Sequence, residues 1–194
     1  MDSPTAIRSF IALELNEPVR IHSASLQDKL RRAVTSVKWV DPLQLHLTLK
    51  FLGDVSTERI PEVSNALEQV VAERAPFDVT FRGAGAFPNA RRPRVLWVGA
   101  HQGAEELCRL AAAVETAMER LGFPKEDKLF RPHLTLGRFR EGAHPPSLES
   151  LLDSLAEEEC GVSHAEHLTL FASRLTPKGP VYTVQSKHMY GSVL

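Results

Sequence analysis

The tetrapeptide HLTL occurs in LQLHLTLKFLG (residues 43–53), again in RPHLTLGRF (residues 131–139), and a third time at residues 167–170. Successive side chains of a β-strand point to opposite faces, so a strand through the first copy places His46 and Thr48 on one face. The two side chains then project side by side, roughly 7 Å apart along the strand. Each copy therefore predicts a half-buried strand that presents a histidine and a threonine.

Strict alternation assigns each residue of the first two copies to a face. The first apolar face takes Leu43, Leu45, Leu47, Leu49 and Phe51, and the polar face takes Gln44, His46, Thr48 and Lys50. In the second copy the apolar face takes Leu134 and Leu136, and the polar face takes Arg131, His133 and Thr135. Phe51 can join the histidine face only if a twist or bulge interrupts the strand.

The composition is that of one globular unit. The 194 residues are 43% hydrophobic and 24% charged, and no linker or low-complexity segment divides them, so we expect residues 1–194 to form a single domain. A formal net charge of −1 gives no sign of a long nucleic-acid or membrane footprint, so an anionic ligand must be bound locally. Because no signal segment or membrane-length apolar run is present, we expect a cytoplasmic protein, and we expect it to be a monomer.

Hydrophobic periodicity predicts the order of the elements. Apolar residues at helical spacing mark residues 18–34, 58–74, 104–123 and 147–159. Strand patterns mark residues 7–15, 43–52, 77–81, 94–99, 133–139, 167–173 and 181–188. The order strand, helix, HLTL strand, helix occurs once in each half, which indicates a duplicated lobe. We expect an α+β fold of two pseudo-symmetric lobes, each an antiparallel sheet with helices on its outer face, around a central cleft.

Two other ligand motifs are not supported by their context. GAGAF (residues 83–87) contains G-x-G but leads to Pro88 and Asn89 rather than to a helix, so it predicts a turn between strands and not a dinucleotide loop. The chain has eight histidines, but neither HxT motif is accompanied by H-x-x-x-H or by a carboxylate at ligand spacing. We therefore expect no metal site.

Two imidazoles and two hydroxyls facing one another suit a metal-free attack on a phosphodiester. A neutral histidine can remove a proton from the nucleophile while a protonated one delivers a proton to the leaving oxygen, since the ordinary histidine pKa is about 6.5. Threonine hydroxyls can donate hydrogen bonds to the non-bridging phosphate oxygens, and a nearby arginine can stabilise the charge. The pattern therefore predicts His46, Thr48, His133 and Thr135 as one catalytic set.

The third copy is expected to pack rather than to react. His167 follows the second copy within the same half of the chain, so it has no counterpart in the first half. A symmetric cleft needs one strand from each half. We therefore expect His167 at an outer or rim position of the C-terminal sheet.

With their flanks HLTLKFLG and RPHLTLGRF, the two motifs resemble the two-histidine phosphoesterases, and specifically the RNA 2′,3′-cyclic phosphodiesterase (LigT-like) family. The resemblance spans nearly the whole chain, including FIALEL, FPNARRPRVLWVG and LFASRLTPKGPVYTV. The family normally has an apolar residue where this chain has His167, which is a departure. The resemblance implies hydrolysis of RNA ends bearing a 2′,3′-cyclic phosphate to a 2′-phosphate, with reverse 2′,5′ ligation and without a cofactor.

Carried over to this chain, the resemblance implies that His46 donates a proton to the leaving ribose oxygen and that His133 activates water. Thr48 and Thr135 map to the phosphate-contacting threonines. Phe51, Arg131 and Arg138 are implied as contacts for the terminal base or phosphate, because aromatic and guanidinium planes stack on unpaired bases. The residues alone do not assign acid and base, because the two lobes are nearly symmetric.

Two other functions remain open from the sequence. The substrate could be a small cyclic phosphate such as ADP-ribose 1″,2″-cyclic phosphate, which a pocket too closed for a polynucleotide would favour. The chain could instead be a noncatalytic module that binds RNA ends or nucleotides. The intact pair of HxT motifs favours catalysis, because a binding module has little need for two proton-transfer groups.

Overall fold

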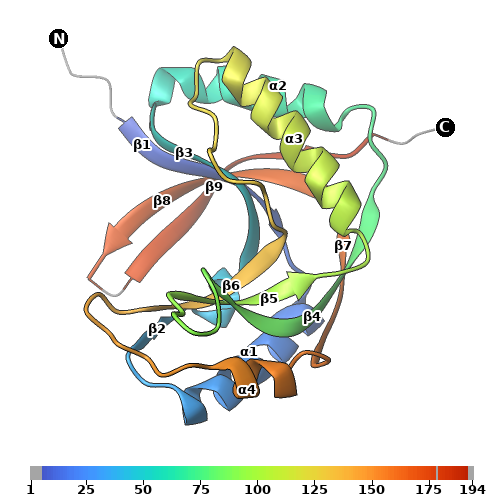
Figure 1. Ribbon diagram of the computed structural model, residues 1–194. Helices are drawn as coiled ribbons and strands as arrows, with labels where there is room; N and C mark the ends of the chain where they lie inside the picture. Colours follow the sequence, from blue (N-terminus) through green and yellow to red (C-terminus); the bar gives the residue numbers. More distant parts are fainter. Residues whose placement is uncertain (1–5, 178, 192–194) are drawn as a thin grey trace.

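The computed structural model describes residues 6–177 and 179–191, which form two antiparallel sheets with helices on their outer sides (Figure 1). Sheet A has the order β3-β1-β8-β9, with bounds His46–Ser56, Ala6–Glu14, His167–Thr176 and Gly179–Met189. Sheet B has the order β2-β6-β5-β4-β7, with bounds Val37–Trp39, His133–Phe139, Val95–Ala100, Phe77–Phe87 and Glu159–Ala165. The predicted α+β fold with two sheet-based lobes is confirmed.

Each sheet has one face covered by two helices. The helices are α1 (Glu17–Ala33), α2 (Ile60–Val71), α3 (Ala104–Arg120) and α4 (Glu149–Ser154). In Figure 1, α2 and α3 lie on sheet A, and α1 and α4 lie on sheet B. Each long helix buries one apolar stripe, which in α3 consists of Leu107, Leu110, Ala111, Val114 and Met118. We call the opposite face of each sheet its inner face.

The lobes do not correspond to the two halves of the chain. Helix α1 follows β1 of sheet A but packs against β7 of sheet B, whereas α3 follows β5 of sheet B but packs beside α2 on sheet A. Strands β4 and β8 are exchanged in the same way, since β4 pairs with β5 and β7 while β8 pairs with β1 and β9. The expectation that each half builds its own lobe was wrong.

Several elements differ from the sequence prediction. The helix expected at residues 147–159 is shortened to the six residues of α4, and residues 159–165, most of which had no predicted element, form β7. The predicted strand at residues 43–52 begins only at His46, because Pro42–Gln44 is a 3₁₀ turn whose first N–H groups are capped by Asp41. GAGAF is no turn but the second half of β4.

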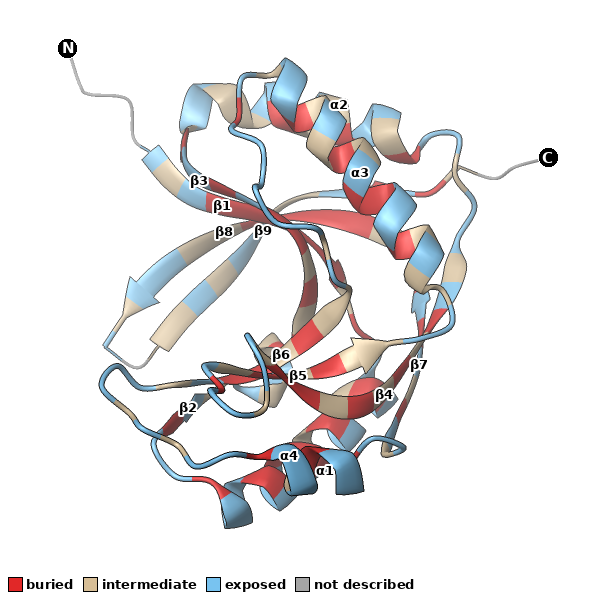
Figure 2. Ribbon diagram, viewed as in Figure 1, coloured by how far each residue is buried: buried red, intermediate tan, exposed pale blue. Residues whose placement is uncertain are grey.

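Figure 2 shows the buried residues gathered where the sheets meet their helices. Ile11 and Leu47 of sheet A and Leu134 and Val98 of sheet B are at most 1% exposed and belong to one continuous core. No helix formed by residues 6–177 and 179–191 has the length and apolar character needed to cross a bilayer.

Candidate active site

Strand β3 places three predicted site residues on the inner face of sheet A. Thr48 lies opposite Ala12 and Lys50 lies opposite Ile11, so Leu49 is an extra residue, a β-bulge. The bulge reverses the alternation that follows it: Lys50 is buried and Phe51 is 54% exposed. His46, Thr48 and Phe51 therefore share one face, and the assignment of Lys50 to the histidine face was wrong.

Strand β6 repeats this arrangement in sheet B. Thr135 lies opposite Trp97 and Gly137 lies opposite Leu96, so Leu136 is the extra residue, at the position equivalent to Leu49. Gly137 is buried like Lys50, and Arg138 is exposed like Phe51. The inner-face residues are therefore His133, Thr135 and Arg138, at the same spacing as in β3. The two strands form matching half-sites that differ in their last member, a phenyl ring in one and a guanidinium in the other.

Both histidines are held by the same backbone contact. His46 Nδ1 lies 2.8 Å from the carbonyl oxygen of Gln44, and His133 Nδ1 lies 2.6 Å from that of Arg131. A carbonyl oxygen can only accept, so each Nδ1 must carry the proton and donate it. In the neutral ring, Nε2 is then the unprotonated nitrogen. Each half-site thus presents Nε2 as the group that can accept or return a proton.

His46 lies in an aromatic environment. Its ring centroid is 4.8 Å from that of Phe10 and 5.2 Å from that of Tyr182, which meets it edge-on. Phe10 stacks on Phe171 at 5.2 Å, so sheet A presents a small aromatic cluster beside the imidazole. Burial lowers the pKa of His46 below its ordinary value, and the bond to the Gln44 carbonyl partly opposes this shift. In the unliganded protein the neutral form is favoured.

His133 has aromatic neighbours and also a cation. The Phe87 ring meets it edge-on at 4.9 Å, and Trp97 lies 6.5 Å away, packed over Gly85, where a Cβ atom would collide with the indole. Burial lowers the pKa of His133, the Arg131 carbonyl opposes this shift, and the positive charge of Arg138 lowers the pKa further. This added cation distinguishes the electrostatics of the two half-sites.

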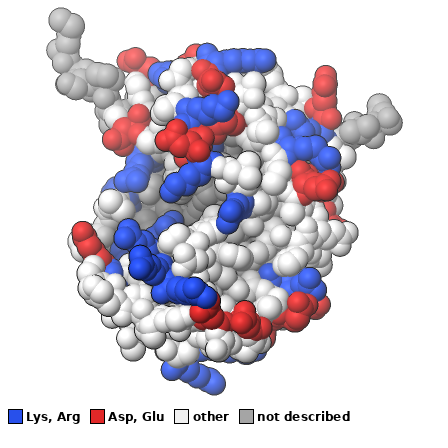
Figure 3. Space-filling model, in the orientation of Figure 1, with Lys and Arg blue, Asp and Glu red and all other residues white. Residues whose placement is uncertain are grey.

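Tyr182 and Arg138 connect the two half-sites across the sheets. Strand β3 of sheet A contacts strand β6 of sheet B, and Tyr182, on β9 of sheet A, contacts His46. The positive charge of Arg138, on β6, lowers the pKa of His133 and opposes the rise that burial causes in the pKa of Tyr182. The inner faces thus turn toward one space, and Figure 3 shows the surface hollowed there, with Lys and Arg side chains along its rims. The structure thereby brings together His46, Thr48, Phe51, His133, Thr135 and Arg138.

Arg131 contributes differently from Arg138. It is exposed and precedes β6, and its carbonyl oxygen is the group that holds His133 Nδ1.

The predictions missed the aromatic neighbours Phe10, Phe87 and Trp97. Phe10 lies within a continuous apolar run whose composition does not distinguish the two faces of β1. Within the described ranges, no group of three His, Cys, Asp or Glu side chains is arranged to hold a metal ion.

The third HLTL copy lies neither at a sheet edge nor in sheet B, the sheet that carries His133. His167 begins β8, an internal strand of sheet A, and Thr169 lies opposite Ala12 on the inner face. His167 Nε2 is 3.4 Å from a carboxylate oxygen of Glu14, which itself accepts from Lys187 Nζ at 2.9 Å. The expected rim position was wrong because β8 crosses into the sheet that carries His46.

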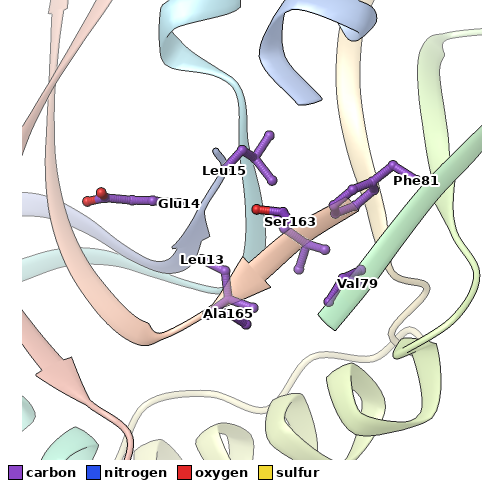
Figure 4. A pocket seen from close by; sticks show the side chains of 8 residues that line it. Leu13, Glu14, Leu15, Val79, Phe81, Ser163 and Ala165 are labelled. Atoms are coloured by element: carbon purple, nitrogen blue, oxygen red, sulfur yellow. The ribbon is translucent and has the colours of Figure 1, made fainter. Parts of the chain in front are cut away.

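Glu14 points away from the core at the end of β1. Figure 4 shows its carboxylate directed away from the narrow cavity lined by Leu13, Leu15, Val79 and Phe81. Burial raises the pKa of Glu14, but the hydrogen bond and charge of Lys187, together with His167, outweigh burial and leave the pKa lowered. The third copy thus belongs to a polar network of Glu14, His167 and Lys187 beside His46.

Two helix-backed sheets, each presenting a histidine and a threonine to a shared hollow, define a two-histidine phosphoesterase. The LigT-like phosphoesterase family model matches this chain twice, at residues 13–97 and 98–182, and the chain belongs to that family. A relative from Methanothermobacter thermautotrophicus, named RNA 2′,3′-cyclic phosphodiesterase, is 36% identical over 178 residues, which is 91% of this chain and 95% of the relative.

Other relatives agree with this assignment. A Thermus thermophilus protein with the same name is 37% identical over 187 residues, covering 93% of this chain and 89% of the relative. A crystal structure of a Thermus thermophilus protein matches with a TM-score of 0.79 at 36% identity, over 96% of this chain and all of the other. The predicted family resemblance is confirmed.

Proposed function

We propose that this protein hydrolyses 2′,3′-cyclic phosphates at RNA ends to 2′-phosphates, using His46 and His133 as a metal-independent acid–base pair. The observation that carries the proposal is the pair of matching half-sites, each with an imidazole fixed through Nδ1 and a threonine on the same face. The names of the curated relatives supply the substrate class.

The step requires a base and an acid on opposite sides of the phosphorus, which strands from two different sheets provide. His133 Nε2 removes a proton from water as the water oxygen attacks phosphorus. The bond from phosphorus to the 3′ oxygen breaks, and protonated His46 Nε2 returns a proton to that oxygen. The product carries a 2′-phosphate and a free 3′-hydroxyl, and the pair is restored when His133 releases its proton and His46 takes one up from solvent.

The surroundings of the histidines support this assignment of roles. Arg138 disfavours a proton on His133, which suits a base. His46 stands beside Phe10, Tyr182 and Phe171, a surface suited to the nucleoside that carries the leaving oxygen. An anionic phosphate entering the site favours the protonated form of His46, which then acts as the acid.

The remaining inner-face residues act on the phosphate and the base. The hydroxyls of Thr48 and Thr135 donate hydrogen bonds to the two non-bridging oxygens, one from each sheet. The Arg138 guanidinium stabilises the charge that accumulates on them, and Phe51 offers a face on which the terminal base stacks. The step needs no organic cofactor. A cytoplasmic location, a monomeric state and reverse 2′,5′ ligation stay predictions.

The test is turnover of a short RNA ending in a 2′,3′-cyclic phosphate, in excess EDTA, with identification of the product. His46→Ala and His133→Ala should each lower kcat about 10²- to 10⁴-fold, the usual contribution of one general acid or base. His167→Ala is the matched control, because it removes the same residue from the same tetrapeptide, and it should stay within a few-fold of wild type.

Three results would contradict the proposal or redirect it. Absence of wild-type turnover, combined with tight binding of the RNA end, would indicate a noncatalytic binding module. Rapid turnover of ADP-ribose 1″,2″-cyclic phosphate with none of RNA would indicate the small-molecule alternative. A collapse in folded His167→Ala would show that the wrong pair of histidines was chosen.

A further inference from the structure

Three cations lie on the inner faces at one end of the site. Arg8 precedes Phe10 by two residues on β1 and therefore shares its face, and it is exposed. On sheet B, Lys38 of β2 lies directly opposite Arg138, so these two side chains share the inner face. Arg8 was not among the predicted site residues. The three cations come from both sheets, and Arg8 shares a face with Phe10 of the aromatic cluster beside His46.

Two of these cations act electrostatically on the hydroxyl of Tyr182. In the register of sheet A, Tyr182 lies opposite Ser173 of β8, and Ala172 of β8 lies opposite Ser9, the residue after Arg8. Burial raises the pKa of Tyr182, and the positive charges of Arg138 and Arg8 both oppose that shift. Contact of Tyr182 with the Phe10 ring at 5.0 Å fixes its position on the face that Arg8 shares. Asp54 lies opposite Arg8 in the register, but no ion pair joins Arg8, Lys38 or Arg138 to a carboxylate in the described part of the chain. Like charges gathered without a counterion favour an anionic ligand.

At the other end of the site, the positive charge is neutralised by a carboxylate. Beyond His46, Glu14 lies opposite it on β1 and neutralises Lys187 through a 2.9 Å ion pair. The same carboxylate accepts from Thr169 at 3.4 Å and contacts His167. Because the charge of Lys187 is already neutralised within this network, it offers no free cation to a second phosphate. Positive charge is therefore available on the Arg8 side of His46 and compensated on the Glu14 side.

Resting on the proposed function, we propose that Arg8, with Tyr182, binds the phosphate on the 5′ side of the terminal nucleotide, and that the RNA leaves the site past this end. Arg8 is four residues from Ala12, which lies opposite Thr48, so about 13 Å of strand separates the two inner-face positions. A long arginine side chain shortens that span to the reach of one nucleotide. The base would then stack between the two phosphates, beside Phe51.

The experiment compares adenosine 2′,3′-cyclic phosphate with its 5′-phosphorylated form, which adds only the phosphate in question. The measured quantity is the ratio of kcat/KM for the 5′-phosphorylated substrate to kcat/KM for the unphosphorylated one. Wild type should prefer the 5′-phosphorylated form. Arg8→Met should lower the ratio about tenfold, the effect of losing one charge-assisted hydrogen bond. Arg8→Lys should retain most of the preference, because it keeps the charge.

Lys187→Met is the matched control, since it removes a cation from the inner face of the same sheet at the other end. Its ratio should equal that of wild type. The proposal is overturned by a wild-type ratio near one, by an unchanged ratio in folded Arg8→Met, or by a fall in Lys187→Met as large as that in Arg8→Met. Failure of the proposed function looks different, because wild type would then turn over neither substrate.

Discussion

His46, His133 and His167 begin three copies of one tetrapeptide, but they have different neighbours. The first two hold Nδ1 against the carbonyl oxygen two residues earlier, whereas His167 turns Nε2 toward Glu14. His46 and His133 are surrounded by aromatic rings that lower their pKa by burial, while His167 shares a carboxylate with Lys187. Identical local sequence thus gives proton-transfer geometry in two places and a polar network in the third.

The pH profile of kcat/KM should reflect the lowered pKa values of His46 and His133. One imidazole must be protonated and the other neutral, so the optimum should lie below the ordinary histidine pKa of about 6.5. Arg138→Gln removes a positive charge that lowers the pKa of His133, so that pKa rises. As the pH falls, His133 in the variant is then protonated at a higher pH than in wild type and can no longer act as the base. The acid limb of the profile should therefore move to higher pH. An acid limb that stays in place would contradict the role given to Arg138.

The residues that could be predicted from the sequence are those that obey alternation. His46, Thr48, His133 and Thr135 share faces as expected, because each pair lies two residues apart before any irregularity. Lys50 and Phe51 follow the bulge, and nothing in the letters KF marks an extra residue. Arg8 was not predicted as a site residue for a related reason: the apolar run that follows it, residues 10–13, is buried on both faces and gives no periodic signal.

At the scale of elements, the bulges at Leu49 and Leu136 determine how the residues after them pack, as well as which residues face the site. In β3 the bulge turns Lys50 beneath α3, where its Nζ donates to Glu115 at 2.7 Å and to the Pro124 carbonyl at 2.9 Å. In β6 the equivalent position is Gly137, where a Cβ atom would lie 2.6 Å from Val37. The same irregularity therefore places a charged residue under a helix in sheet A, whereas in sheet B the side chains of the neighbouring strand β2 leave room only for a glycine.

Lys50→Met should destabilise the protein, because it leaves the Glu115 carboxylate without its cation. The Lys50 and Glu115 side chains are 1% and 19% exposed, and breaking such a pair typically costs 3–5 kcal/mol. The partial exposure of Glu115 argues for the lower end, a loss of about 3 kcal/mol in the free energy of unfolding, measured by urea denaturation. Lys50→Met combined with Glu115→Gln should recover part of this loss; a double variant less stable than the single one would refute the explanation.

The elements that sequence patterns missed or placed wrongly are those decided by distant partners. ECGVSHA forms β7 because β4 supplies its hydrogen bonds, pairing Phe77 with Ala165 and Phe81 with Gly161. The preceding SLESLLDSL carries a helical stripe, but only residues 149–154 are helical. The long helices have complete apolar faces of their own, and their predicted positions agree with the structure to within a few residues at each end.

At the scale of the whole molecule, the two lobes are interlocked rather than joined in series. Sheet A takes β8 and β9 from the second half of the chain, and sheet B takes β2 and β4 from the first. Helices α1 and α3 each cross to the lobe opposite the strand they follow. Periodicity reveals that elements repeat but not which sheet each joins, since strand pairing across more than a hundred residues leaves no local signature. The duplication was therefore predictable and the exchange was not.

Interlocking predicts that the protein unfolds as one unit. Each sheet contains strands from both halves of the chain, and α1 and α3 each pack on the lobe opposite the strand they follow, so a single cooperative transition is expected. The two tryptophans, Trp39 and Trp97, both lie in sheet B, so their fluorescence follows that sheet, while far-ultraviolet circular dichroism follows both sheets and the helices. The two signals should share one urea midpoint.

Native-state hydrogen exchange extends this test to individual strands. Amides of Ile11 and Leu170 in sheet A should open with the same free energy as those of Val98 and Leu134 in sheet B, because all four report global unfolding. A set of sheet A amides that exchanged at a distinctly lower free energy would show two separable domains. The active site would then be an interface between independently folding parts, and substrate binding would have to pay for docking them before His46 and His133 could act together.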